Sequence, residues 1–235
     1  MRSPEEKKTF VKQKFSSISG SYDLINSLVS FKIDSYWRWV TTRELKIFPE
    51  GAVLDLCAGT LPLSLELARQ AKRRRVVSID FCEDMIRAGV NNLPSDERRS
   101  RIMPVCGDGE DIPAHDNSFW GCTVAFGVRN LSRTERGLRE MYRVLKPTGK
   151  LLILEFSRPK NPLVKPLYFF YLNKILPTVA GLVSGDKEAY EYLASSIAQF
   201  YEPKVLLKMM KEAGFAKVYC RQLTFGIVTI YVGVK

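Results

Sequence analysis

Small and acidic residues recur where successive apolar runs of the sequence end. The first run leads into Gly59 and Thr60, and the second ends at Asp80. The third run ends at Asp108 and Gly109. In an open sheet of parallel strands, the carboxyl ends of the strands meet at one edge, and ligands bind there. We therefore expect these positions to form one ligand site.

The residue types at these strand ends fit an adenosine group without phosphates. Gly59 and Thr60 are small enough for a ligand to approach the backbone, but the turn lacks the G-x-G-x-x-G pattern that cradles a pyrophosphate. NAD and FAD are therefore disfavoured. Asp80 is placed to accept hydrogen bonds from both ribose hydroxyls. Asp108 can accept one from the adenine amino group. We predict that the cofactor is S-adenosylmethionine.

Alternating strands and helices must position these residues. Residues from about 5 to 45 have helical patterns, and apolar runs of strand length then occupy 52–57, 75–81, 101–108, 121–127 and 150–156. A helix over 132–146 is expected to begin at a capping box formed by Ser132 and Glu135. A helix over 202–215 follows the lid described below. Two β runs without a helix between them end the chain and predict an antiparallel hairpin.

The predicted fold class is α/β, with a Rossmann-like fold of the methyltransferase type. We expect a seven-stranded, mostly parallel sheet with an antiparallel C-terminal strand, and helices on both of its faces. The chain should form a single domain over 1–235, with an N-terminal helical cap over 1–48. A Pro- and aromatic-rich insertion over 159–200 is expected to form a helical lid.

Composition limits the classes of partner and compartment. The 235 residues carry a net charge of +11, which suits an anionic partner such as the surface of a membrane. Five cysteines without a C-x-x-C motif, and a single histidine, predict neither a disulfide framework nor a metal site. The polar N-terminus does not resemble a signal peptide. We therefore predict a cytoplasmic protein.

One segment, Leu163 to Val183, is long enough to span a bilayer. It contains Lys165 and Lys174, as well as two prolines. Each lysine near the centre of a spanning helix costs about 2.5–3.5 kcal/mol. A surface-lying or lid segment is therefore the better reading, and we expect peripheral contact with an anionic membrane surface.

The sequence resembles the UbiE/MenG family of quinone-biosynthesis C-methyltransferases over essentially its whole length. The matching stretches include "VLDLCAGT", "GDGEDIPAHDNSF", "AFGVRNL", "YRVLKPTGKLLILEFSRP" and "GDKEAYEYLASSI". The resemblance implies contacts to S-adenosylmethionine at Thr60, Asp80, Asp108 and Gly109, with Gly59 and Ala125 beside them. It implies that the acceptor is a demethylated prenyl quinol, such as demethylmenaquinol.

The chain departs from the usual family pattern at several positions. Leu61 and Pro62 stand where a glycine and an acid usually follow Gly-Thr. Thr148 replaces the first glycine of a Gly-Gly pair, Ala125 stands where a serine is often found, and Asp34 replaces a basic residue. The loss of the serine removes a hydrogen bond to the cofactor.

Methylation of a quinol ring carbon requires an aligned acceptor, a stabilised phenolate and a route for the ring proton. Arg129 and Asn130 directly follow the fourth strand, so Arg129 can stabilise the phenolate or hold a water; alternatively it pairs with Glu155. Tyr22 is the other catalytic candidate, and alternatively an ordinary buried tyrosine. His115 lies in a polar turn, where a solvated loop residue is the better reading.

The lid suits a lipid substrate. Its aromatic and aliphatic residues either line a tunnel for a prenyl tail or simply pack over the sheet: Tyr168, Phe169, Phe170, Tyr171, Leu172, Ile175 and Leu176. A nucleic-acid methyltransferase would more often carry Asn/Asp-Pro-Pro-aromatic after the fourth strand, where this chain has "GVRNL", so no nucleic-acid partner is expected. Two alternatives stay open: methylation of another small molecule or lipid, and a non-catalytic protein that binds S-adenosylmethionine. A homodimer is also left open.

Overall fold

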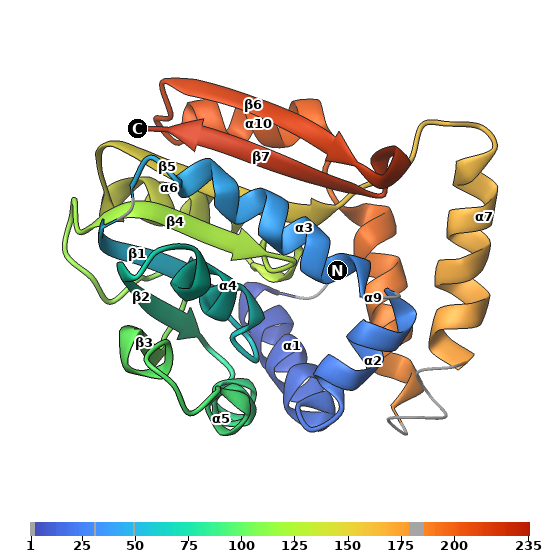
Figure 1. Cartoon of the computed structure of the whole chain (residues 1–235). Coiled ribbons are helices and arrows are strands. Elements are labelled where there is room, and N and C mark those ends of the chain that lie inside the picture. Colours follow the sequence, from blue (N-terminus) through green and yellow to red (C-terminus); the bar gives the residue numbers. More distant parts are fainter. Residues whose placement is uncertain (1–2, 31, 49, 179–185) are drawn as a thin grey trace.

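A seven-stranded sheet forms the centre of the molecule (Figure 1). The computed structural model describes residues 3–30, 32–48, 50–178 and 186–235. The strand order is β3-β2-β1-β4-β5-β7-β6, and β7 runs antiparallel to both of its neighbours. The predicted Rossmann-like fold and its closing hairpin are therefore confirmed. The strands are β1 (Glu50–Leu56), β2 (Arg73–Asp80), β3 (Ile102–Cys106), β4 (Phe119–Ala125), β5 (Leu145–Phe156), β6 (Lys217–Leu223) and β7 (Val228–Val234).

Helices cover both faces of the sheet, as expected. On one face, α3 (Ile33–Thr42) and α4 (Pro62–Gln70) pack Trp37 and Leu67 into one apolar core. On the other face, α6 (Thr134–Val144) and α10 (Pro203–Glu212) pack Leu138 and Leu206 into a second core. The remaining elements of this part are α5 (Glu83–Asn92) and the short 3-10 turns Arg43–Leu45, Arg99–Arg101, Val128–Asn130 and Thr224–Gly226.

A third apolar cluster lies outside the sheet, between the N-terminal helices and the lid. It joins α1 (Pro4–Ile18) and α2 (Tyr22–Val29) to α7 (Val164–Phe170) and α9 (Lys187–Gln199). After α7 the chain continues through a π-helical turn, Tyr171–Ile175. Such turns are rare and often occur at functional sites. Figure 1 shows these helices gathered at one end of the sheet.

Two local expectations were wrong. The first was the capping box, because α6 begins at Thr134 and the Ser132 hydroxyl donates to Glu110 instead. The second was a helix that continues to residue 146: β5 already begins at Leu145, which pairs with Phe119 of β4. Pro147 explains this end of the helix, because the residue before a proline favours an extended backbone.

Two of the departures from the family pattern place a side chain where the backbone favours glycine. Leu61 has a φ of 68° and Thr148 a φ of 66°. A left-handed residue with a side chain costs about 1–2 kcal/mol. The Leu61 side chain is buried against the first core, and Gly89 of α5 leaves room for it because any added Cβ would collide with Leu61. Both turns therefore hold a residue with a side chain in the left-handed conformation.

Candidate active site

The predicted ribose acid, Asp80, lies buried at the end of β2. Its two carboxylate oxygens accept hydrogen bonds from the backbone amides of Gly59 and Cys82, both at 2.9 Å. Burial raises the pKa of Asp80, and the amide hydrogen bonds oppose this shift. Each oxygen keeps a second lone pair. Asp80 therefore fixes the turn after β1 while keeping acceptor capacity for a ligand hydroxyl.

The predicted adenine acid, Asp108, is held by a helix that the sequence did not connect to it. Lys8 of α1 lies 2.6 Å from the Asp108 carboxylate and 3.1 Å from that of Glu110. Burial lowers the pKa of Lys8, but its hydrogen bonds to the two carboxylates outweigh that effect and raise it. No local pattern marks Lys8, because the contact depends on how α1 crosses the strand ends.

A small cavity of about 30 Å³, the strand-end cavity, brings several predicted residues together. Asp80, Asp108, Gly109 and Asn130 line it, together with Lys8. The predicted ribose and adenine acids therefore share one site, as their strand-end positions required. A cavity of about 30 Å³ is smaller than an adenosine group, and Lys8 occupies one side of it.

The other predicted cofactor residues do not line this cavity. The Thr60 hydroxyl donates to Asp23 of α2 at 2.5 Å, which ties the N-terminal cap to the turn after β1. Gly59 has a φ of 56°, a left-handed conformation that glycine adopts without strain. Ala125, at the end of β4, packs against the core on the α3 side of the sheet. These three are outside the lining of the strand-end cavity as the structure describes it.

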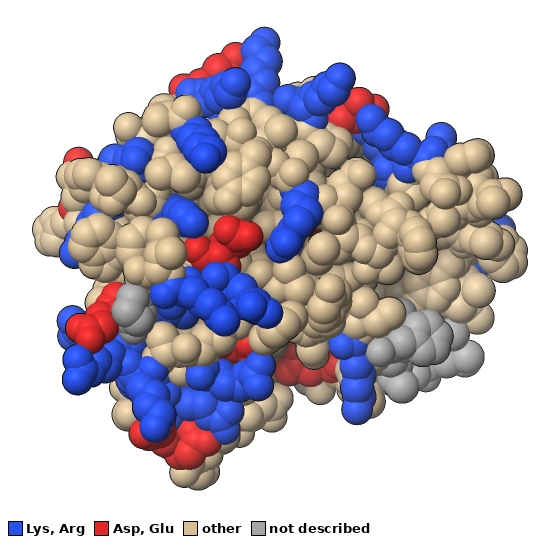
Figure 2. Space-filling view, turned by 45° about the horizontal axis from the view of Figure 1, so that its top comes forward, with Lys and Arg blue, Asp and Glu red and all other residues tan. Residues whose placement is uncertain are grey.

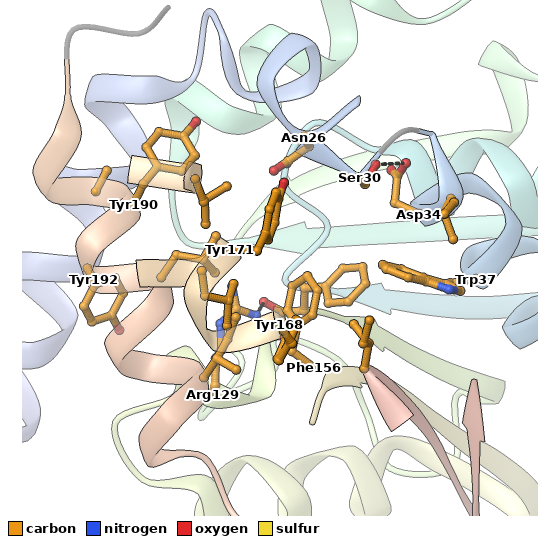
Figure 3. A pocket seen from close by; sticks show the side chains of 18 of the residues that line it. Asn26, Ser30, Asp34, Trp37, Arg129, Phe156, Tyr168, Tyr171, Tyr190 and Tyr192 are labelled. Carbon is orange, nitrogen blue, oxygen red and sulfur yellow. Dashed lines mark hydrogen bonds between the residues drawn. The ribbon is translucent and has the colours of Figure 1, made fainter. Parts of the chain in front are cut away.

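A second and larger cavity, the apolar cavity, holds about 370 Å³ (Figure 3). Its walls come from α1, α2, α3, α7 and α9, and from the turns at residues 126–129 and 224–227. Two of the predicted catalytic residues, Tyr22 and Arg129, line it. Burial raises the pKa of the Tyr22 phenol, and the nearby Arg129 opposes that shift.

The third predicted catalytic residue, Asn130, lies on the other side of the same turn. Arg129 lines the apolar cavity and Asn130 lines the strand-end cavity. The Asn130 side-chain oxygen accepts a hydrogen bond from Tyr192 of α9 at 3.2 Å. The turn Val128–Asn130 therefore separates the predicted cofactor site from the apolar cavity.

Arg129 forms the buried ion pair that the sequence offered as its alternative role. Its Nη1 lies 2.8 Å from Glu155 Oε1, and it also donates to the carbonyl of Phe126. Burial raises the pKa of Glu155, although Arg129 opposes the shift. Within the described part of the chain, Arg129 Nε is buried without a hydrogen-bond partner. The ion pair therefore leaves Nε of the guanidinium without a hydrogen bond to the described residues, although that atom is not open to the cavity.

Two tyrosines that line the apolar cavity also carry a buried hydroxyl group that lacks a hydrogen-bond partner in the described part of the chain. Tyr168 of α7 and Tyr190 of α9 are buried, and their hydroxyls find no partner among the described residues. Figure 3 shows Tyr168 beside Arg129 and Phe156, with Tyr190 further along the cavity. Buried polar groups are nearly always hydrogen-bonded. A polar group of a ligand could satisfy these hydroxyls only after the side chains shift, because neither oxygen is open to the cavity.

Some of the remaining predicted residues line the apolar cavity, and others do not. Tyr168, Tyr171, Leu172 and Leu176 of the lid line the apolar cavity, while Phe169, Phe170 and Ile175 are not among its lining residues. His115 is exposed in its turn, and Asp34 lines the cavity while paired with Arg38. The described residues contain no cluster of side chains suited to a metal ion.

The lid also bears on membrane insertion. None of the helices in the described ranges combines the length and apolar character that a membrane crossing needs. Residues 179–183 of the long apolar segment lie outside the described residues.

Comparison with known proteins places the chain in a family. A profile of the ubiE/COQ5 methyltransferase family matches residues 1–235. The chain belongs to the ubiE/COQ5 methyltransferase family. It is therefore an S-adenosylmethionine-dependent methyltransferase, as the sequence predicted.

Relatives of this family are similar over nearly the full chain. A ubiquinone/menaquinone biosynthesis C-methyltransferase of Geotalea daltonii is 39% identical over 231 residues, which cover 98% of each chain. A demethylmenaquinone methyltransferase of Clavibacter sepedonicus is 40% identical over 225 residues, which cover 96% of this chain and 90% of the relative.

Solved structures confirm the fold. An S-adenosylmethionine-dependent methyltransferase of Thermotoga maritima superposes with a TM-score of 0.67 at 19% identity, covering 94% of this chain and 98% of that one. A phosphoethanolamine N-methyltransferase of Haemonchus contortus, solved with S-adenosylmethionine, gives a TM-score of 0.62 at 13% identity, covering 84% of this chain and 52% of that one. The chain therefore has the same fold as these methyltransferases.

Proposed function

We propose that this protein methylates a ring carbon of a demethylated prenyl quinol, demethylmenaquinol or a related compound, in quinone biosynthesis. The observation that carries the proposal is the apolar cavity, which lies one turn away from the predicted cofactor site and offers buried, unpartnered polar groups. A cavity of about 370 Å³ falls within the usual range for small-molecule sites. The names of the relatives point to the same substrate class.

In this proposal the strand-end residues hold S-adenosylmethionine. Asp80 accepts the ribose hydroxyls, and Asp108 accepts the adenine amino group after Lys8 moves aside. The turn at Gly59 and Thr60 faces the methionine part. Ala125 and Gly109 allow close approach of the cofactor to the backbone, where a larger side chain would fill the space.

The chemical step balances without a further reactant. The ionised quinol makes the adjacent ring carbon nucleophilic, and that carbon forms a bond to the sulfonium methyl. The carbon–sulfur electrons return to sulfur, giving S-adenosylhomocysteine. The ring carbon then loses its proton, which restores the aromatic ring.

The polar groups at the turn stabilise this step. Once its side chain shifts toward the cavity, the unpartnered Nε of Arg129 donates to the quinol oxygen as negative charge develops there, which is where such a contact lowers the barrier most. A water held by Arg129 carries the ring proton away, while Asn130 lies on the other side of the turn, toward the cofactor. Tyr22 lies over the reacting ring from α2, and its raised pKa keeps the phenol protonated as a donor. After a similar shift, the hydroxyls of Tyr168 and Tyr190 donate to the quinol oxygens.

The prenyl tail follows the apolar residues of the lid. Its hydrophobicity would keep the substrate in a bilayer, so peripheral contact with an anionic membrane from the cytoplasmic side belongs to the proposal. The net charge of +11 supports such contact. Salt should then release the protein from anionic vesicles, because exposed charges are screened.

The test is methyl transfer from labelled S-adenosylmethionine to a panel of demethylated quinols of different ring and tail. We expect turnover with at least one demethylated naphthoquinol or benzoquinol. Binding of S-adenosylmethionine without turnover on any member would instead favour a non-catalytic binding protein, or a methyltransferase for another small molecule.

A further inference from the structure

The outer face of α7 exposes a row of large apolar side chains. Leu163, Leu167 and Phe170 are 77%, 71% and 60% exposed, respectively. Their spacing of four and then three residues places them on one side of the helix. The inward side of the same helix carries Tyr168, which lines the apolar cavity. The helix is therefore apolar on both of these sides, and among the described residues only the inner side is covered by protein.

A second exposed aromatic residue lies at the same end of the molecule. Phe225, in the turn between β6 and β7, is 78% exposed. This turn is bonded to the segment that leads into α7, because the Ser157 hydroxyl donates to the carbonyl of Gly226 at 2.8 Å. Figure 1 shows the turn beside the start of the lid. We call Leu163, Leu167, Phe170 and Phe225 together the α7 face.

Within the stretch 158–178, which contains α7, all charged residues are basic, and one of them, Arg158, pairs with Glu202. Residues 158–178 include Arg158, Lys160, Lys165 and Lys174 and contain neither Asp nor Glu. The three lysines are exposed. In Figure 2 this end of the molecule is largely uncharged, with lysine and arginine at its margins. Protruding apolar side chains flanked by basic ones suit the headgroup region of an anionic bilayer.

The α7 face is continuous with the apolar cavity. Leu167 is largely exposed and also lines the cavity. Val164 on the same helix and Ile227, close to Phe225 in the sequence, line the cavity too. The apolar surface of α7 therefore continues from the outside of the molecule into the lining of the cavity.

We propose that the α7 face docks on the surface of an anionic phospholipid bilayer and serves as the portal through which the tail of a prenyl quinol enters the apolar cavity. The second half of this inference rests on the proposed function; the docking half does not. A bilayer is favoured over a second copy of the chain because the exposed lysines of this segment, Lys160, Lys165 and Lys174, would repel those of an identical face across a twofold interface.

The variant Leu163→Ser/Phe170→Ser tests the docking half. Both residues are exposed and lie outside the cavity lining, and serine at the start of α7 is a favourable helix cap. The matched control, Ile47→Ser/Met103→Ser, replaces two residues of similar exposure away from the lid. Co-sedimentation with phosphatidylglycerol-containing vesicles should fall at least tenfold for the α7 variant and stay unchanged for the control.

The portal half is tested by turnover on two quinols. With a long-chain quinol embedded in vesicles, the α7 variant should lose most of its rate, whereas with a short-chain, water-soluble quinol it should keep the wild-type rate. Vesicle binding equal to wild type, or a change of oligomeric state in the variant measured by sedimentation velocity, would overturn the docking proposal. If the wild-type protein methylates neither quinol, the proposed function fails, and the vesicle result still decides the docking.

Discussion

The replacement Arg129→Ala should damage both stability and turnover, because one guanidinium serves both. Its Nη1 neutralises Glu155, whose carboxylate is fully buried, while its Nε is buried at the apolar cavity without a partner. Alanine at this position leaves the Glu155 charge buried with only backbone donors, namely the amides of residue 129 and Phe156.

The loss of stability can be worked out from this geometry. Removing one partner of a buried ion pair costs about 3–5 kcal/mol. In a domain of this size, each kcal/mol lowers the melting temperature by about 2–4 °C. The variant should therefore melt roughly 6 to 20 °C earlier than wild type. The turnover per folded molecule should fall about a hundredfold or more, because a charge-stabilising donor is lost.

A double variant separates the two effects. Arg129→Met/Glu155→Gln removes both buried charges and should recover most of the lost stability, since uncharged replacements for a buried pair are often neutral. Its turnover should stay as low as that of Arg129→Ala. Melting temperature by circular dichroism and turnover on the same preparation provide the comparison. If the double variant recovers turnover together with stability, Arg129 is a structural residue and the catalytic role assigned to it is wrong.

Three further predictions address the cofactor site and the backbone. Lys8→Met should tighten binding of S-adenosylmethionine about two- to fivefold in calorimetry, because an ion pair worth up to about 1 kcal/mol no longer competes with the cofactor for Asp108. Lys12→Met on the same helix is the control, and weaker binding by the Lys8 variant would contradict this competition. Burial raises the pKa of Asp55 from 3.8 to about 6, so the stability gained from its protonated form is complete below about pH 4 and lost as the pH rises through 6. Asp55→Asn should abolish up to about 3 kcal/mol of that pH dependence, measured from urea midpoints between pH 4 and 8, and an unchanged profile would refute the assignment. Thr148→Gly should relieve about 1–2 kcal/mol of left-handed strain in the folded state, while the more flexible unfolded chain costs about 0.4–1 kcal/mol of stability. The melting temperature should therefore rise by about 1–3 °C, and a decrease would show that the threonine is not strained.

The alternation of apolar runs was enough to predict the sheet, its closing hairpin and the helices on both faces. These features follow from local periodicity and from the rule that parallel strands present their carboxyl ends at one edge. The same rule brought Asp80 and Asp108 to one cavity. The site residues that the sequence predicted to share a cavity lie at strand ends, because the order of the strands in the chain determines where these ends meet.

Contacts between distant helices could not be predicted in this way. The ion pair of Lys8 with Asp108 depends on the path of α1 across the sheet, and the bond from Thr60 to Asp23 depends on the placement of α2. The unpartnered hydroxyl of Tyr168 was also hidden, because an aromatic run predicts burial but not what each hydroxyl faces. The start of β5 was missed because apolar residues at the end of α6 fit either period.

The most direct test of the account is the position of the transferred methyl group. The wild-type protein is incubated with methyl-labelled S-adenosylmethionine and reduced demethylmenaquinol, and the product is analysed by mass spectrometry with fragmentation. We expect one labelled methyl on a ring carbon, both quinol oxygens unmodified, and one S-adenosylhomocysteine formed for each product. A methyl group on a quinol oxygen, or S-adenosylmethionine bound but never consumed, would contradict this expectation.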